Sequence, residues 1–322
     1  MPGDPDESQI IARILQLGPE GGRHRPPPHP AAAPGDDAAL VGPGLVVTVD
    51  TMMEGVHWDD RLSAEDVGWK LVAVNASDIG AMGGRPTWAL LSISLPAPAD
   101  AAWLEGFSRG LGQALGRYGA RLVGGDTTRS PGPIALSLTM AGQAPRPLPR
   151  SGGRPGDQLW VSGTLGEAAG GFFDGAPPGL SWWRRPEPPV ELGAAIAEAG
   201  LAHAMMDLSD GLLVDLGRLC AASGCGARVD PLALPVGPAL ATLDPALRLQ
   251  RQVAFGEDFQ LLLAAPADQA EALAALARGM GLRLSCIGTL TEAPGLVLST
   301  GEAWPAPAFA HFPATPAPGD PA

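Results

Sequence analysis

The sequence predicts a protein of two domains, each built from a mixture of helices and strands. The chain has 322 residues, 45% of them hydrophobic, which is the length and apolar content of about two cores. Helical and strand-like patterns alternate in both halves. The 44 glycines and 35 prolines gather in a few stretches. One of these, residues 146–156, lies near the midpoint, and we place the domain boundary there.

The first half begins with a predicted helix and then alternates strands with longer helices. Ser63 followed by Asp66 matches an N-terminal capping box, so a long helix is expected to begin there. Ser92 and Ser94 alternate with apolar residues, as in a strand with one polar face. The expected helices are residues 8–17, 63–82 and 100–118, and the expected strands are residues 45–49, 88–95, a segment near 122, and 134–141.

The second half shows the same mixture. The predicted strands are residues 158–162, 205–208, 227–229, 260–264 and 284–287, and the predicted helices are 211–222 and 267–280. The second helix is rich in alanine, the best helix former. Glycine- and proline-rich stretches at 18–35, 145–156 and 170–189 are predicted loops, and the tail at 313–322 has nothing to bury and is predicted to be disordered.

The charged residues exclude several classes of function. Of the 21 basic residues, 20 are arginine and only Lys70 is lysine. Lys70 lies in Gly-Trp-Lys-Leu, which excludes the Gly-Lys-Ser/Thr of a Walker A loop. The net charge of −13 argues against a nucleic-acid partner, because phosphate contacts need clustered cations. It leaves phosphate chemistry open, because bound cations invert the local charge.

The cysteines and the N-terminus indicate a cytoplasmic protein with no membrane partner. Cys220, Cys225 and Cys286 form no C-x-x-C pair, which argues against a disulfide framework or a zinc site. The N-terminus is acidic, whereas a signal peptide begins with basic residues. No apolar run approaches the ~18 residues that a membrane span requires.

Aspartates are the side chains that carry the predicted chemistry. Seven lie beside glycine, serine, threonine or another aspartate near the ends of predicted elements: Asp36, Asp37, Asp50, Asp78, Asp126, Asp207 and Asp210. Magnesium prefers carboxylate oxygens, and carboxylates that converge without a cation repel one another. A single aspartate at such a place is as well explained by a helix cap or a turn. A metal site therefore depends on the segments converging.

Two of these segments are more specific than the rest. Asp207 and Asp210 are expected on one strand-to-helix turn. The run Gly124-Gly125-Asp126-Thr127-Thr128 is predicted to be a phosphate-binding loop, because paired glycines let backbone N–H groups approach a phosphate.

Eight segments taken together resemble the thiamine-monophosphate kinase family. They are residues 35–40, 50–57, 70–83, 124–129, 150–152, 155–157, 207–211 and 256–259. They occur in order over nearly the whole chain, and their joint presence is far more specific than any one of them. That family is similar to the PurM-like (aminoimidazole-ribonucleotide-synthetase) superfamily, whose ATP site has no Walker A loop.

The resemblance implies an α+β fold of two PurM-like domains. Residues 1–145 would form the ATP- and Mg²⁺-binding domain, which joins sheets with a second copy into a dimeric β-barrel, and residues 151–312 would form the C-terminal domain. It also implies ATP-dependent phosphorylation of thiamine monophosphate to thiamine diphosphate, by in-line transfer with several Mg²⁺ ions. Such a reaction needs positioning and charge neutralisation more than covalent help.

The resemblance also assigns site residues by position. The Mg²⁺ ligands fall on Asp37, Thr48, Asp50, Asp78, Asp126, Asp207 and Asp210. Among these, the catalytic role falls on Asp50, Asp126, Asp207 and Asp210. The ATP contacts fall on Gly125, Asp126, Arg150 and Ser209, and the substrate contacts on His57, Glu257 and Phe309.

The chain departs from the family pattern at Val49, Phe255 and Gln260 and in the compact stretch 170–189, which leaves the geometry of the substrate site open. Lys70 is expected on the surface of its helix or paired with an acidic neighbour. Two other functions remain alternatives: another PurM-like enzyme of the aminoimidazole-ribonucleotide-synthetase type, and a non-catalytic acidic module that binds metal or nucleotide.

Overall fold

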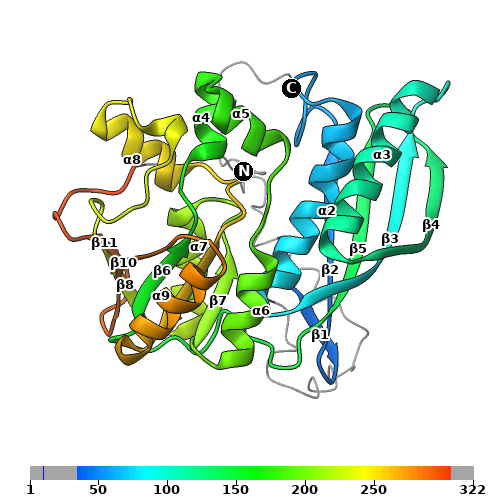
Figure 1. Ribbon diagram of the computed structural model, residues 1–322. Helices are drawn as coiled ribbons and strands as arrows, with labels where there is room; N and C mark the ends of the chain where they lie inside the picture. The colour runs from blue at the N-terminus through cyan, green and yellow to red at the C-terminus, as the bar shows by residue number, and fades with distance from the viewer. Residues whose placement is uncertain (1–9, 11–34, 306–322) are drawn as a thin grey trace, which may run out of the picture.

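The computed structural model describes residue 10 and residues 35–305, and the helix predicted at 8–17, Phe309 and the tail at 313–322 lie outside this part of the chain. Two β-sheets stand side by side, one from each half of the sequence (Figure 1). Helix α2 lies between them, and the segment that joins the halves, residues 144–157, contains no helix or strand.

The N-terminal half forms a five-stranded sheet in the order β1-β2-β5-β3-β4. Its neighbouring strands are antiparallel except for β3 and β4, which are parallel. The strands are β1 (Ala39–Gly42), β2 (Leu45–Met53), β3 (Arg85–Leu95), β4 (Arg121–Arg129) and β5 (Ala135–Gln143). Helices α2 (Ala64–Ala81) and α3 (Ala101–Tyr118) pack on one face of this sheet.

Local signals fix the starts of both helices, as predicted. The Ser63 hydroxyl accepts a hydrogen bond from the Asp66 N–H, and the Asp66 carboxylate accepts one from the Ser63 N–H. Asp100 caps α3, which ends at Gly119 in the left-handed conformation that glycine adopts readily. Alternate residues of β2 and β5 point into the core beneath these helices, as the period of a strand requires.

The opposite face of the five-stranded sheet is open. Val49 on this face is 60% exposed, and within residues 35–305 no helix covers it (Figure 1). Strand β4 is exposed along its whole length and forms one edge of the sheet. An open face beside a long unpaired edge is a surface that other chains can join.

The C-terminal half forms a six-stranded sheet in the order β11-β8-β10-β6-β9-β7. Its strands are β6 (Gln158–Ser162), β7 (Ala204–Asp207), β8 (Gly226–Val229), β9 (Leu261–Ala265), β10 (Leu284–Thr291) and β11 (Leu296–Leu298). Helix α7 (Leu212–Ser223) packs on one face, and α6 (Val190–Ala199) and α9 (Ala270–Gly279) pack on the other. Both faces of this sheet are therefore buried. The remaining short elements are α8 (Pro245–Ala254) and the 3₁₀ turns at Pro238–Leu240 and Ala267–Gln269.

The stretch 170–189, expected to be a loop, is largely helical. It contains most of α4 (Glu167–Asp174) and all of α5 (Pro177–Arg184), which lie beside α2 (Figure 1). Pro177 and Pro178 occupy the first turn of α5, where a helix leaves its N–H groups unbonded anyway. A Cβ on Gly171 would lie 2.2 Å from the Gly179 carbonyl carbon, so the glycines let the two helices approach closely. None of the helices in the described part of the chain is long and apolar enough to cross a membrane.

Candidate active site

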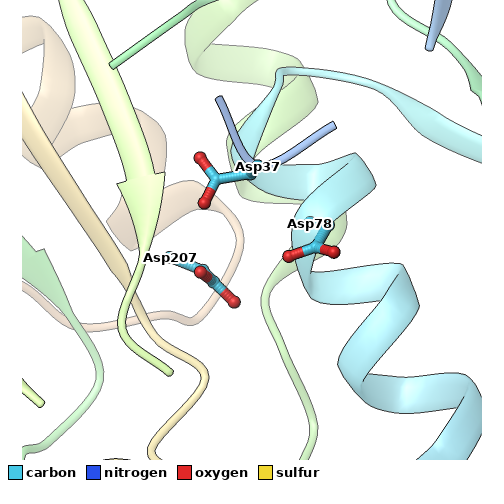
Figure 2. Close-up of side chains that lie close together, drawn as sticks. All are labelled: Asp37, Asp78 and Asp207. Carbon is cyan, nitrogen blue, oxygen red and sulfur yellow. The ribbon is translucent and has the colours of Figure 1, made fainter. Parts of the chain in front are cut away.

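Three aspartates from distant parts of the sequence converge between the two halves. Asp37 precedes β1, Asp78 lies on α2, and Asp207 ends β7. One carboxylate oxygen from each lies within 4.8 Å of the other two, and the three side chains lie close together (Figure 2). Asp37 and Asp207 are buried. The structure thus brings three of the predicted Mg²⁺ ligands close to one another.

Neighbouring side chains hold this carboxylate cluster in place. The Thr48 hydroxyl on β2 donates to Asp78 Oδ2 at 2.5 Å, and the Ser77 hydroxyl donates to Asp207 Oδ2 at 2.7 Å. Arg150 Nη2 donates to Asp37 Oδ1 at 2.6 Å. The other oxygen of that carboxylate, Oδ2, is buried and has no hydrogen-bond partner among the residues that the structure describes.

Burial and mutual repulsion disfavour the charged form of these carboxyls. Burial raises the pKa of Asp50 to about 6, against the opposing effect of its hydrogen bond with Asp78 and with the help of the charges of Asp210 and Asp37. The pKa of Asp78 is raised well above its ordinary value by burial and by Asp50, Asp207 and Asp37. Burial and the charge of Asp37 likewise raise the pKa of Asp207. Like charges this close are stabilised when a cation lies among them.

A hard divalent cation fits this set of groups. All the facing donors are carboxylate or hydroxyl oxygens, which magnesium prefers, and no group within residues 35–305 donates a hydrogen bond to the buried Asp37 Oδ2. Four of the predicted ligands besides Asp37 lie in the same group: Thr48, Asp50, Asp78 and Asp207.

Asp210 lies on the turn between β7 and α7, as predicted, and is held by residues that the sequence did not single out. Asp215 Oδ2 on α7 accepts hydrogen bonds from the N–H groups of Asp210 at 2.9 Å and Gly211 at 3.0 Å. Arg218 pairs with both Asp210 and Asp215. Burial raises the pKa of Asp215 to about 7. The sequence contains one local signal for this support: Asp215 places a carboxylate in the first turn of the helix that follows Asp210-Gly211.

An open pocket of about 530 Å³ adjoins the carboxylate cluster. Part of its wall, which we call the carboxylate end, is formed by Asp50, Asp78, Asp207, Ser209 and Asp210. Another part, which we call the aromatic end, is formed by Trp58, Phe172, Phe173, Trp183 and Phe255. One cavity therefore joins a site for cations to a site for flat apolar rings.

The aromatic end is built from α4, α5, the segment after α8 and Trp58 on the loop between β2 and α2. The Phe172 ring lies 5.1 Å from Trp183 in an edge-on arrangement and 5.3 Å from Phe255 in a stacked one. The Arg61 guanidinium lies 4.4 Å from the centres of both the Phe172 and Trp183 rings. Phe172, Phe173 and Trp183 are not among the predicted site residues, because they lie in the stretch 170–189, which is predicted to be a loop. Phe255 is noted in the sequence only as a departure from the family pattern.

Two predicted substrate residues line the pocket. His57 lies on the loop after β2, where its Nδ1 accepts a hydrogen bond from the Met53 N–H at 3.0 Å. Glu257 has a φ of 69°, a left-handed conformation that is uncommon for residues other than glycine. Its N–H donates to the Ser209 carbonyl at 2.8 Å. A Cβ on Gly256 would lie 1.9 Å from that carbonyl, so glycine is required for this contact between the loops.

The departures from the family pattern have different consequences. Phe255 lines the pocket. Gln260 instead accepts a hydrogen bond from the Ser162 hydroxyl in the interior, and Val49 lies on the open face of the sheet. Lys70 is not on the helix surface: it is buried and pairs with Glu257, which is far away in the sequence.

Gly125 and Asp126 do not form a phosphate-binding loop. They lie within β4, where a Cβ on Gly125 would be 1.9 Å from the Leu91 carbonyl oxygen, so this glycine permits close contact with the neighbouring strand. Asp126 is exposed. On the open face, Asp126 pairs with Ser92, Ser92 with Ser137, and Ser137 with Thr51. Asp126 is therefore three strand spacings, about 14 Å, from Thr51, the neighbour of Asp50. Asp50 faces the other side, toward α2, so one chain does not bring Asp126 to the carboxylate cluster.

Sequence similarity over both halves shows to which family the chain belongs. The models of the N-terminal and C-terminal domains of AIR synthase related protein match residues 35–144 and 154–301. The thiamine-monophosphate kinase of Escherichia coli strain K12 is 38% identical over 275 residues, which cover 80% of this chain and 83% of that protein. The chain belongs to the thiamine-monophosphate kinase family. It is an enzyme of that family, and the resemblance inferred from its motifs is confirmed.

Solved structures of thiamine-monophosphate kinases confirm the two-domain PurM-like fold. The enzyme from Stenotrophomonas maltophilia K279a is 38% identical and superposes with a TM-score of 0.75, covering 92% of this chain and 96% of that one. A structure described as AaThiL complexed with AMPPCP and TMP gives a TM-score of 0.82 at 29% identity, covering 95% and 97%. The hydrogenase maturation protein HypE of E. coli, at 20% identity and a TM-score of 0.69 over 84% of this chain and 88% of that one, shares the fold.

Proposed function

We propose that the chain transfers the γ-phosphoryl group of ATP to thiamine monophosphate, giving thiamine diphosphate. The observation that carries this proposal is the single pocket with a carboxylate end and an aromatic end. Thiamine monophosphate has the same two parts, a phosphate and a cationic heteroaromatic body. The related structure that contains AMPPCP, an ATP analogue, together with TMP supports both substrates.

The aromatic end suits the body of the acceptor. Phe172, Phe173 and Phe255 line the pocket, and aromatic rings attract a cationic ring such as thiazolium. The Glu257 carboxylate lines the same pocket and supplies a negative charge. His57 completes this wall on the side of the N-terminal half. Phe309, the third predicted substrate residue, remains a prediction.

The carboxylate end suits the phosphoryl groups. Asp37, Asp50, Asp78 and Asp207, with Thr48 and Asp210 beside them, are the residues that would hold magnesium. Bound magnesium supplies positive charge that neutralises the phosphates. Arg150 lies at the same cluster with a forked guanidinium suited to phosphate oxygens, and Ser209 faces the pocket from the next loop. These groups position the reactants and keep their charges balanced, which is most of what phosphoryl transfer requires.

We also propose that the enzyme is a homodimer in which the partner supplies Asp126. The open face of the five-stranded sheet and the free edge of β4 carry exposed apolar side chains, among them Val49, Leu122 and Val123. A second copy joined at this surface would cover them. It would also bring a Gly125–Asp126 segment from outside, which a single chain does not provide.

Mixing two inactive variants tests this arrangement. In a mixed dimer of Asp50→Asn and Asp126→Asn chains, one site contains both substitutions and the other contains none, provided that Asp126 acts across the dimer. We expect mixing to restore activity to about a quarter of the wild-type level on statistical grounds, with half the dimers mixed and half their sites intact. If Asp126 acts within its own chain, every site in the mixture has a defect and activity stays at the level of the separate variants.

The function itself is tested by product formation. We expect thiamine diphosphate to appear when the enzyme is given ATP, Mg²⁺ and thiamine monophosphate, and not when free thiamine replaces the monophosphate or a chelator removes the metal. Turnover of a purine ribonucleotide intermediate instead would favour the aminoimidazole-ribonucleotide-synthetase alternative. Binding of ATP without turnover of either substrate would favour the non-catalytic module. The cytoplasmic location and the domain boundary at 146–156 remain predictions.

A further inference from the structure

The only lysine of the chain is buried in the middle of α2. Lys70 is 1% exposed and is the largest of the fully buried side chains, although lysine is almost never fully buried unless it is paired. Its partner is Glu257, whose carboxylate Oε2 accepts a hydrogen bond from the ammonium group. Two residues 187 positions apart in sequence are thus joined across the two halves of the molecule.

The surroundings of the pair belong to the pocket. Both residues line it, and the Lys70 ammonium lies 5.1 Å from the centre of the Trp183 ring. The carboxylate of Glu257 is 25% exposed, whereas Lys70 is enclosed behind it. Glu257 is therefore the more accessible partner at the pocket wall, and Lys70 is the more enclosed one.

The backbone at Glu257 is held in an uncommon conformation. Its φ of 69° lies in the left-handed region, which costs a non-glycine residue free energy and persists only where surrounding contacts enforce it. The N–H of Glu257 is bound to Ser209, and the ion pair with Lys70 holds the side chain. Such strain is characteristic of groups that must present a side chain in one direction.

Stability alone does not account for a buried ion pair here. Removing two charges from water costs about as much as their attraction returns, and an apolar pair of similar volume would serve the core equally well. The two halves also have an independent link, because Arg185 pairs with Glu65 and Asp66 at the start of α2. The other 20 basic residues of the chain are arginine. Beside Trp183 the chain has a lysine, whose ammonium group is more compact than a guanidinium group and needs less room.

We propose that Lys70 is a positioning residue for the acceptor: it holds the Glu257 carboxylate toward the aromatic end, where that carboxylate meets the cationic ring of the acceptor. This inference rests on the proposed function. Because the ammonium uses Oε2, the Oε1 side of the carboxylate is directed to the ligand. Lys70 thereby sets acceptor affinity without touching the acceptor or the nucleotide.

The test compares Lys70→Met with Arg185→Met, which also removes a cation that joins α2 to the C-terminal half but lies outside the pocket. For each variant, kcat and the KM values for thiamine monophosphate and ATP are measured, together with the thermal unfolding midpoint. We expect Lys70→Met to raise the acceptor KM by about 10-fold or more, as the loss of a charged hydrogen bond implies, with kcat and the ATP KM within about 2-fold of wild type. Arg185→Met should change only the unfolding midpoint.

Two further variants define the pair. Glu257→Gln should raise the acceptor KM as much as Lys70→Met, and the double variant should be no worse than either, because both remove one interaction. Lys70→Arg should recover part of the affinity. If Lys70→Met does not fold, Glu257→Asp, which keeps the charge and withdraws the carboxylate, tests the same prediction.

The outcomes separate this inference from the proposed function. A wild-type enzyme that makes no thiamine diphosphate contradicts the function. Normal wild-type turnover with an unchanged acceptor KM in Lys70→Met, and an unfolding midpoint lowered as in Arg185→Met, reduces Lys70 to a structural role. A fall in kcat at constant acceptor KM would also overturn the proposal.

Discussion

The two ends of the pocket are built in opposite ways. The carboxylate end draws its residues from β2, from α2 and from the end of β7 with the turn after it, spread over residues 50–210. Most of the aromatic end comes from one hairpin of short helices, α4 and α5, with Phe255 added from another loop. The first end brings together charges that repel each other, and the second brings together rings that attract each other.

This difference suggests that the carboxylate end carries out phosphoryl transfer and that the aromatic end selects the acceptor. Like charges are held together only where the frame is rigid, and two sheets and a buried helix provide that frame. The rings pack favourably on their own, so the aromatic end can change its shape through single substitutions such as Phe255. We therefore expect substitutions at the carboxylate end to lower kcat, and those at the aromatic end to raise the acceptor KM.

The largest effect is expected at the carboxylate cluster. Asp207→Asn should lower kcat by about 10³-fold, because a charged group that stabilises the transferred phosphoryl group is lost. The circular dichroism spectrum should be unchanged. Asp268→Asn, on an exposed 3₁₀ turn, is the matched control and should retain full activity. Retention of more than a tenth of wild-type kcat by Asp207→Asn would place the chemistry elsewhere.

A smaller effect is expected at Asp215, which supports the Asp210 turn beside the carboxylate cluster. Asp215→Asn leaves the ligands in place but removes the carboxylate that holds the Asp210 and Gly211 N–H groups. Loss of such a supporting carboxylate typically weakens metal binding by 10- to 100-fold. We expect the Mg²⁺ concentration needed for half-maximal activity to rise by about 30-fold, with activity recovered at high Mg²⁺. An unchanged Mg²⁺ requirement would show that the loop holds its shape without Asp215.

At the aromatic end, Phe173→Ala should raise the KM for thiamine monophosphate by about 10-fold, since an aromatic contact contributes about 0.5–1.5 kcal/mol beyond the area that it buries. The ATP KM should not change. Phe173 is 44% exposed, so the fold should tolerate the substitution. Leu232→Ala, which removes a side chain that is 88% exposed and does not line the pocket, is the control. A fall in kcat without a change in KM would contradict the division of labour between the two ends.

The smallest effect concerns stability and pH. Burial raises the pKa of Asp50 to about 6, so between about pH 4 and pH 6 the folded carboxyl binds a proton that the unfolded one releases. Without metal, its contribution to the free energy of unfolding therefore falls as the pH rises through this range.

Calorimetry in a chelator measures this effect. At pH 7, Asp50→Asn should unfold about 3 °C above the wild type, and at pH 4 the two should coincide. With saturating Mg²⁺ at pH 7, the order should reverse. An equal difference at both pH values without metal would show that the carboxyl of Asp50 is not responsible.

Much of the fold and of the carboxylate end could be predicted because local signals specify them. The capping box at Ser63 fixed the start of α2, and the pattern around Asp207 fixed the turn from β7 to α7. Where the same residue type has two physical uses, prediction failed. Proline marks loops but also begins helices, as in α5. Glycine lets backbone N–H groups bind a phosphate, but it also lets neighbouring strands pack closely, as at Gly125.

Long-range partners could not be predicted from the sequence. The pairing of Lys70 with Glu257 and the ring contacts of Phe172 with Phe255 depend on how the two halves meet. No local pattern encodes that geometry. The position of Asp126 on an exposed edge also depends on the order of strands in the sheet.

The central claim is that one ligand spans both ends of the pocket. It is tested by calorimetric titration of thiamine monophosphate and of free thiamine into the enzyme, each with Mg²⁺ and with a chelator. We predict that removing Mg²⁺ weakens the binding of the monophosphate by about 10-fold or more, as the loss of charged contacts implies, and leaves the binding of free thiamine unchanged. Equal effects of Mg²⁺ on both ligands, or none on either, would contradict the claim.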